Sequence, residues 1–193
     1  MNDVVTRAVA RLEIARQIIG ELNLLTRWAA FGTPMIVGAV AYGLVVAPDI
    51  DLEIFCDDPR IADGFEVLKA CAQHANVTAI RFANQLDGPD QGLYWRVDYQ
   101  HAGELWKLDM WSMRRDHPGP RAADLVEPLR AALTVESRTA ILTLKEQLRA
   151  QTAIRCPSIA VYQAVIDHHV RTLPELATWL KSHDSRRLTT WRP

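Results

Sequence analysis

The sequence predicts an α+β fold in which a mixed β-sheet flanked by helices is followed by a C-terminal helical subdomain. Of the 193 residues, 49% are hydrophobic and 23% are charged, which is typical of a globular protein with one sizeable core. Segments with strand periodicity alternate with helical segments as far as residue 118, and after Pro118-Gly119-Pro120 every periodic segment is helical. We therefore expect an α/β domain over 1–118 and a helical subdomain over 119–193.

A long helix and a short strand open the α/β domain. Apolar residues at alternating spacings of three and four predict an amphipathic helix, and they are Val5, Ala8, Leu12, Ala15, Ile19 and Leu22. Such a short stripe more often packs on its own core than forms a coiled coil, and a homodimer through this helix is the alternative. Gly32-Thr33-Pro34 ends the helix. A short buried strand over 35–37 and a helix after Gly38 follow.

The next strand is predicted over 49–55. Acidic and apolar residues alternate in Asp49-Ile50-Asp51-Leu52-Glu53-Ile54-Phe55, so one face carries carboxylates and the other is hydrophobic. The following elements are, in chain order, a helix over 61–74, a strand over 77–82, a polar loop over 84–92 and strands over 93–99 and 105–113. The last two strands form a hairpin through His101-Ala102-Gly103.

The C-terminal subdomain is predicted to contain helices only. Their ranges are 122–133, 135–150, 158–169 and 173–182, separated by Thr134, Pro157 and Pro174. The basic segment from Arg186 to Arg192 ends the chain, and we expect it to be frayed.

Charge and cysteine usage exclude several functional classes. Lys and Arg number 22 against 23 for Asp and Glu, a net charge of −1, so charge does not indicate nucleic acid or an anionic membrane as a partner. The three cysteines form no metal or redox motif, which fits the reducing cytosol. The start lacks a secretory signal, and the most apolar run, 34–48, is too short to span a bilayer. We therefore expect a cytoplasmic protein.

Asp49 and Asp51 are candidate metal ligands. They share one face of a predicted strand, with Cα atoms about 7 Å apart. Two unpaired charges at that distance repel by about 2–3 kcal/mol at an effective dielectric constant near 20, and a divalent cation offsets this repulsion. Mg²⁺ prefers carboxylate oxygens together with substrate phosphates. A solvated acidic sheet face is the alternative explanation.

A phosphate site is predicted beside this acidic pair. The strand that ends at Gly38 leads into a helix N-terminus, whose backbone N–H groups and positive dipole end attract a phosphate. Gly38 itself lets the backbone approach a ligand closely. The sequence thus predicts a phosphate site and a metal site on neighbouring strands.

These residues resemble the signature of the polymerase-beta-like nucleotidyltransferase superfamily. In that signature a hydrophobic residue, Gly, and Gly or Ser precede a spacer and an acidic pair between apolar residues. Here Val37-Gly38-Ala39 is followed, after nine residues, by Asp49-Ile50-Asp51-Leu52. A third carboxylate on a later strand fits Asp109 in Leu108-Asp109-Met110, and Asp98 is the runner-up. The C-terminal helices resemble the partner domain of the minimal and aminoglycoside-type members.

The resemblance implies transfer of a nucleoside monophosphate from a triphosphate such as ATP to a hydroxyl of an unidentified acceptor, with pyrophosphate leaving. Asp49 and Asp51 would hold two Mg²⁺ ions. Asp109 would share one of them and accept the acceptor's proton. Gly38 and Ala39 would bind the nucleotide phosphates.

Ala39 departs from the signature, because Ser or Gly usually occupies this position and a serine hydroxyl contact is lost. Weaker triphosphate binding, an altered donor and lapsed activity are all open. The alternative function is therefore a nucleotide- or partner-binding module without turnover. A glycosyltransferase with a D-x-D pair ranks third, since the chain is short for that fold.

Weaker candidates lie near these residues. Glu53 extends the acidic face beyond Asp51, where we expect it at most to support the metal ligands. Three arginines after the Asp109 strand could contact a triphosphate, namely Arg114, Arg115 and Arg121. Packing or surface roles are expected for Trp95, Trp106, Trp111, His168 and His169.

Overall fold

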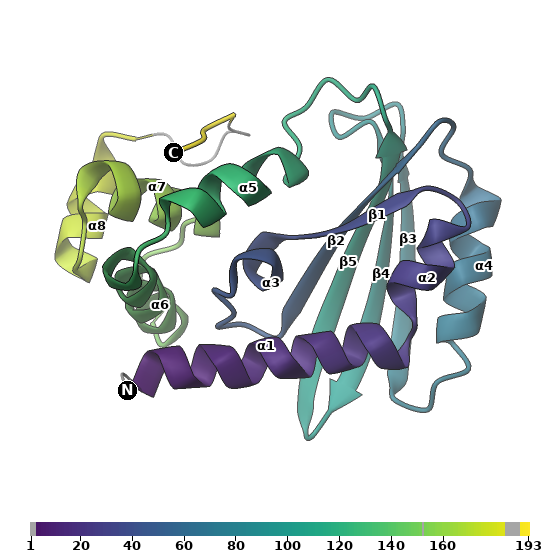
Figure 1. The fold of residues 1–193 in the computed structure, drawn as a ribbon, viewed down its shortest axis with the longest axis horizontal. Coiled ribbons are helices and arrows are strands. Elements are labelled where there is room, and N and C mark those ends of the chain that lie inside the picture. Colours follow the sequence, from purple (N-terminus) through teal and green to yellow (C-terminus); the bar gives the residue numbers. More distant parts are fainter. Residues whose placement is uncertain (1–2, 152, 184–189) are drawn as a thin grey trace.

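A computed structural model describes residues 3–151, 153–183 and 190–193. A five-stranded mixed sheet forms one part of the molecule, with strand order β1-β2-β5-β4-β3 (Figure 1). The strands are β1 (Thr33–Val37), β2 (Asp49–Cys56), β3 (Val77–Gln85), β4 (Gly92–His101) and β5 (Glu104–Arg114). The β2–β5 pair is parallel and the other three pairs are antiparallel. The predicted α+β fold is confirmed.

Helices cover one face of the sheet and form the second part of the molecule. The helices of the first part are α1 (Asp3–Glu21), α2 (Leu24–Ala29), α3 (Gly38–Tyr42) and α4 (Ile61–Cys71). The C-terminal helices are α5 (Ala123–Ala132), α6 (Val135–Arg149), α7 (Ser158–His168) and α8 (Leu173–Lys181), and they gather at the opposite end from α2 and α4 in Figure 1. Among the described residues, no helix combines the length and the hydropathy that crossing a bilayer requires.

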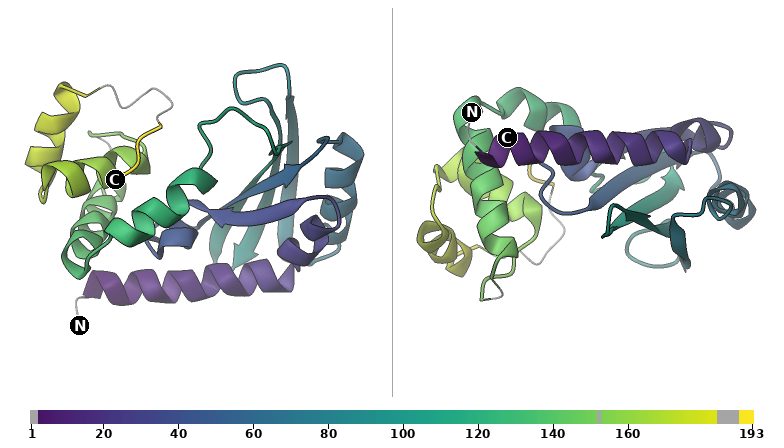
Figure 2. Two further views of the ribbon diagram at one scale, coloured as in Figure 1. Left: turned by 45° about the horizontal axis from the view of Figure 1, so that its top comes forward. Right: turned by 90° about the horizontal axis from the view of Figure 1, so that it is seen from below.

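Two hydrophobic clusters hold these parts together. In the sheet cluster, the apolar face of β2 packs with α2, α4 and the second half of α1, and it includes Ile50, Leu52 and the fully buried Trp95. The helical cluster joins α5–α8 to α3 and to the start of α1 through Val4 and Ala8. Helix α1 therefore packs along both parts, as Figures 1 and 2 show.

The helical predictions are confirmed with one exception near the N-terminus. We expected one helix up to Gly32, but the chain turns at Asn23, which adopts a left-handed conformation with φ of 49°. Asparagine tolerates this conformation better than most residues. The turn redirects the chain so that Leu24 and Trp28 are buried in the sheet cluster.

The first strand also differs from expectation. β1 lies at the edge of the sheet, and Met35 remains 36% exposed, so the strand is only partly buried. An edge position is compatible with Pro34, which cannot donate a ladder hydrogen bond. Its last residue, Val37, is buried and is paired with Asp51 of β2.

Candidate functional site

Three carboxylates converge where β2 and β5 run side by side. Asp51 is directly paired with Asp109 across the parallel β2–β5 ladder, and Asp49 precedes Asp51 by two residues on the same face. One carboxylate oxygen of each residue lies within 4.8 Å of those of the other two. The structure thus brings together Asp49, Asp51 and Asp109, as an acidic cluster on the sheet face that α2 and α4 leave uncovered.

Asp98 lies outside this cluster. It is buried on β4, one strand farther from β2, and is paired with Lys107 in the strand register. Its carboxylate accepts from Arg96 Nε at 2.6 Å and lies 3.4 Å from Arg81 Nη2. Because two arginines already neutralise Asp98, the geometry favours Asp109 as the third carboxylate.

The acidic cluster carries more negative charge than its hydrogen bonds compensate. Burial, reinforced by Asp49 and Asp109, raises the pKa of Asp51 to about 7. Burial also raises the pKa of Asp49, and Asp49 Oδ1 is buried with no hydrogen-bond partner among the described residues. Unpartnered carboxylate oxygens of this kind fit a hard divalent cation such as Mg²⁺.

Tyr94 on β4 orients the third carboxylate. Its hydroxyl donates a hydrogen bond to Asp109 Oδ1, and burial together with this bond raises the pKa of Tyr94 to about 12. The tyrosine therefore stays protonated at neutral pH and leaves the second oxygen of Asp109 available. Sequence reasoning missed Tyr94, which becomes visible only once the β4–β5 register places it near Asp109.

Gly38 is required by the close approach of Asp51. Its φ is 62°, and a Cβ atom added there would lie 2.2 Å from Asp51 Oδ2. Any side chain at this position would displace the carboxylate. The prediction that the Gly38 turn and the acidic pair lie on neighbouring strands is confirmed by the β1–β2 pairing.

The N-terminal turn of α3 borders the same space as the acidic cluster. Gly38 and Ala39 both line the cavity described below. The first N–H groups of a helix have no partner within that helix, so these two residues offer backbone donors beside the carboxylates. Their role as phosphate ligands stays a prediction.

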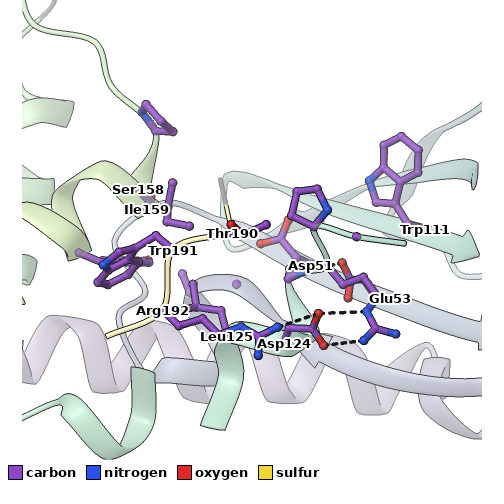
Figure 3. A pocket seen from close by; sticks show the side chains of 18 of the residues that line it. Asp51, Glu53, Trp111, Asp124, Leu125, Ser158, Ile159, Thr190, Trp191 and Arg192 are labelled. Carbon is purple, nitrogen blue, oxygen red and sulfur yellow. Dashed lines mark hydrogen bonds and ion pairs between the residues drawn. The ribbon is translucent and has the colours of Figure 1, made fainter. Parts of the chain in front are cut away.

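A cavity of about 650 Å³ separates the acidic cluster from the C-terminal helices. Figure 3 shows Asp51 and Glu53 facing Ser158 and Ile159 of α7 across it. Its volume lies within the range of small-molecule pockets, which is about 300–1,000 Å³. The acidic face thus borders a cavity that the C-terminal helices line on the far side, and its three carboxylate residues are partly buried.

Lys145 on α6 supplies a half-buried cation at this cavity. Its Nζ donates to the Leu44 carbonyl at 2.9 Å and to the Tyr162 hydroxyl at 3.2 Å. Burial lowers the pKa of Lys145 to about 8, while Asp51 and Asp49 oppose this shift. Sequence reasoning missed Lys145. The available signal was a lysine four residues after the buried Ile141, on the apolar stripe of an amphipathic helix.

The carbonyls at the C-terminal end of α3 bind further cations of the C-terminal helices. Arg130 Nε donates to the Ala41 carbonyl at 2.9 Å, and Arg138 Nη1 donates to the Tyr42 carbonyl at 2.7 Å. These carbonyls are the negative end of the helix dipole. The contacts attach the helix that follows Gly38 directly to α5 and α6.

Glu53 links the acidic strand to α5. It is buried, and its two carboxylate oxygens accept from the backbone N–H groups of Ala122 at 2.7 Å and Ala123 at 2.8 Å. Burial raises the pKa of Glu53, and these two hydrogen bonds oppose the rise. Glu53 is not a member of the acidic cluster. Its printed hydrogen bonds go to α5, and support of the metal ligands by Glu53 stays a prediction.

The weaker candidates divide between the cavity and the surface. Arg121 lines the cavity and binds Asp124 at 2.9 Å, whereas Arg114 and Arg115 pair with acidic residues elsewhere. Trp95 and Trp106 are fully buried as expected. Trp111 lines the cavity with its ring centre 5.0 Å from that of Tyr94. His168 and His169 do not contribute to the cavity lining that the structure describes.

The end of the chain differs from the expectation of a frayed tail. Residues 186–189 lie outside the described residues, but Thr190, Trp191 and Arg192 line the cavity. Trp191 also packs against the helical cluster. The prediction is therefore wrong for the last residues, because an aromatic side chain finds an apolar surface there that the sequence does not reveal.

Two solved structures that match this chain are nucleotide-transferring enzymes. A cytoplasmic RNA terminal U-transferase matches with a TM-score of 0.57 at 13% identity, over 80% of this chain and 44% of that chain. The non-canonical poly(A) polymerase GLD-2, in complex with GLD-3, matches with a TM-score of 0.52 at 11% identity, over 98% of this chain and 68% of that one. The chain thus spans less than half the length of the U-transferase.

These matches show which fold the chain has. No family model matches the sequence, and no curated protein sequence matches it either. The chain has the fold of the polymerase-beta-like nucleotidyltransferases, which the sequence motif predicts. Within that fold, its acidic cluster could bind a metal ion.

Proposed function

We propose that the chain is a divalent-metal-dependent nucleotidyltransferase that transfers a nucleoside monophosphate from a nucleoside triphosphate to a hydroxyl acceptor. The observation that carries this proposal is the acidic cluster beside the Gly38 turn at the wall of a cavity. Carboxylates alone would repel a triphosphate, so the proposal includes a cation, and Mg²⁺ is the ion that such ligands favour.

In this proposal Asp49, Asp51 and Asp109 hold the metal. Bound Mg²⁺ would neutralise phosphate charge and lower the pKa of the acceptor hydroxyl. Asp109, oriented by Tyr94, would accept the acceptor's proton. Catalysis would then consist mainly of positioning and charge stabilisation.

Other groups at the cavity would bind the triphosphate. Lys145 offers the positive charge, and the backbone N–H groups of Gly38 and Ala39 offer hydrogen-bond donors. The methyl side chain of Ala39 adds no donor, so we expect phosphate binding at this turn through the backbone only. This observation supports the second candidate function, a nucleotide- or partner-binding module with lapsed activity.

Experiments must identify the acceptor, the cellular location and the oligomeric state. The named relatives act on RNA, as a terminal U-transferase and a poly(A) polymerase, so an RNA 3′ hydroxyl belongs in an acceptor screen although the net charge of −1 does not indicate it. We also propose the division into 1–118 and 119–193, because every helix after residue 118 packs into the helical cluster, which joins this segment to α1 and α3. A cytoplasmic location and a homodimer stay predictions.

Pyrophosphate release tests the proposed function. The protein is incubated with each of the four ribonucleoside triphosphates, Mg²⁺ or Mn²⁺, and a set of RNA and small-molecule hydroxyl acceptors. We expect metal-dependent release that falls by about 100-fold or more in Asp49→Asn and Asp109→Asn, because each variant removes a metal ligand. Asp98→Asn is the matched control, and a folded Asp98→Asn protein should retain activity.

Three results would contradict parts of this proposal. Loss of activity in Asp98→Asn but not in Asp109→Asn would show that the third carboxylate is wrongly assigned. Metal-dependent nucleotide binding without pyrophosphate release would favour the binding module. Binding of neither metal nor nucleotide would reject both functions.

A further inference from the structure

The C-terminal residues Thr190, Trp191 and Arg192 form part of the cavity wall, although the helix before them, α8, ends at Lys181. Two contacts hold them in place. Trp191 Nε1 donates to Asp167 Oδ2 on α7 at 2.6 Å, and Arg192 Nη2 lies 3.1 Å from Asp124 Oδ2 on α5. The end of the chain is thus attached to two helices that border the cavity.

These residues leave the cavity open to a ligand. With them in place, the cavity still measures about 650 Å³, a volume that accommodates a drug-sized molecule. They therefore complete its wall and do not fill it. A docked chain end in a cavity of this size is better explained as a ligand-contacting surface than as a plug.

The two sides of the cavity differ in chemistry. One side carries Asp51 and Glu53, and the opposite side carries Trp191 with Ile159, as Figure 3 shows. Leu125 and Pro157 add further apolar surface to the lining. A nucleoside triphosphate has the same polarity, with a charged polyphosphate at one end and a flat aromatic base at the other.

The Trp191 side chain is suited to contact the aromatic end of such a ligand. Its indole N–H is bound to Asp167, and its ring both packs on the helical cluster and lines the cavity. A ring fixed in this way loses little conformational freedom when a base stacks on it. Indole rings stack on bases of any sequence, because every base has a π-face.

We propose that Trp191 is the surface against which the nucleobase of the donor packs, and that Arg192 is a positioning residue that holds this wall through Asp124. The inference rests on the proposed function and extends it to the base-contacting end of the donor pocket. Trp191 would thus determine donor affinity, while the acidic cluster performs the chemistry.

Calorimetric titration tests this assignment with two probes. One is the set of α,β-methylene analogues of the four nucleoside triphosphates with Mg²⁺, and the other is Mg²⁺-tripolyphosphate, which lacks the nucleoside. We expect Trp191→Ala to weaken analogue binding by about tenfold or more, since stacking on one base contributes an affinity of that order. Trp191→Phe should retain most of the affinity, and Arg192→Ala should lose a smaller factor.

The tripolyphosphate titration separates base contact from a general structural effect. Its affinity should be unchanged in all three variants, because the polyphosphate end does not reach Trp191. If Trp191→Ala folds poorly, a protein that ends at residue 189 is the second test. This shortened protein should also bind the analogue more weakly and tripolyphosphate with unchanged affinity. Trp179→Ala on α8, outside the cavity lining, is the control and should bind both probes normally.

Several outcomes would overturn the inference. Unchanged analogue affinity in Trp191→Ala would exclude a base contact. Tighter binding would show that the chain end obstructs the cavity, and an equal loss for tripolyphosphate would show a merely structural role. If the wild type binds the analogue and a variant gives one of these results, only this inference is contradicted. If the wild type does not bind the analogue, the proposed function and the inference are contradicted together.

Discussion

Asp51 is needed for the candidate site, but its ionised form destabilises the folded protein. Its pKa rises from 3.8 in the reference state to about 7 in the folded protein, chiefly through burial. A raised pKa means that the folded protein holds the carboxyl proton more tightly than the unfolded chain does. The fold is therefore most stable below the unfolded-state pKa, and it loses stability as the pH rises from that value through the folded-state pKa. The metal-free protein should therefore lose stability between about pH 4 and pH 7 on account of Asp51.

Asp51→Asn removes this pH-dependent cost. In EDTA at pH 8 we expect the variant to be more stable than the wild type, by at most about 4 kcal/mol for a pKa shift of roughly three units. Below pH 4 the advantage should vanish, because Asp51 is then protonated in both states. Thermal denaturation of both proteins over pH 4–8 measures the difference, and an advantage that does not depend on pH would contradict the assignment.

At the scale of the elements, a direct connection between β2 and α5 forms part of the cavity lining. Glu53 lies two residues beyond Asp51 on the same strand and caps the first N–H groups of α5. The carboxylate also lies at the positive end of that helix dipole. Strand β2 thus carries two members of the acidic cluster at its start and the attachment of the facing helix at its centre.

Glu53→Gln should weaken this attachment. The amide keeps one acceptor oxygen, so one N–H of Ala122 or Ala123 loses its charged partner, at a cost of about 1–3 kcal/mol. Urea unfolding checks this value. Glu127→Gln, which changes an exposed residue of α5 paired with Arg130, is the matched control and should cost less than about 1 kcal/mol. Equal costs in the two variants would argue against the capping role.

At the scale of the whole molecule, the candidate site lies between two hydrophobic clusters. Asp49, Asp51 and Asp109 belong to the sheet, while Lys145 belongs to the C-terminal helices. Helix α1 connects both parts, and Arg7 binds Glu146 of α6 with Nη2–Oε2 and Nε–Oε1 distances of 2.5 and 2.8 Å. A ligand that contacts both walls would add a further connection between them.

Metal and nucleotide should therefore stabilise the whole chain together. We expect Mg²⁺ with an α,β-methylene analogue at 100 times its dissociation constant to raise the free energy of unfolding by about 2.7 kcal/mol. A thermal shift assay in EDTA, in Mg²⁺ alone and in Mg²⁺ with the analogue measures this effect. Asp109→Asn should lose most of the combined shift, and an equal shift in EDTA would show that the metal is not required.

The sequence by itself determined the local elements and the acidic pair. Apolar periodicity locates the helices and strands within a few residues, since it reflects burial within single elements. The alternation around Asp49 and Asp51 places both carboxylates on one face, and the resemblance points to Asp109. The sequence left Asp98 open, because choosing between them requires the β2–β5 register.

Only the tertiary structure decided which distant residues share the cavity. The turn at Asn23 depends on how α2 packs into the sheet cluster. The positions of Lys145 and Trp191 depend on how α5–α8 pack against α3 and the sheet. Such contacts join residues far apart in the chain, and no local period records them. The physical reason is that burial between elements, and not propensity within them, determines where a lysine or tryptophan side chain comes to lie.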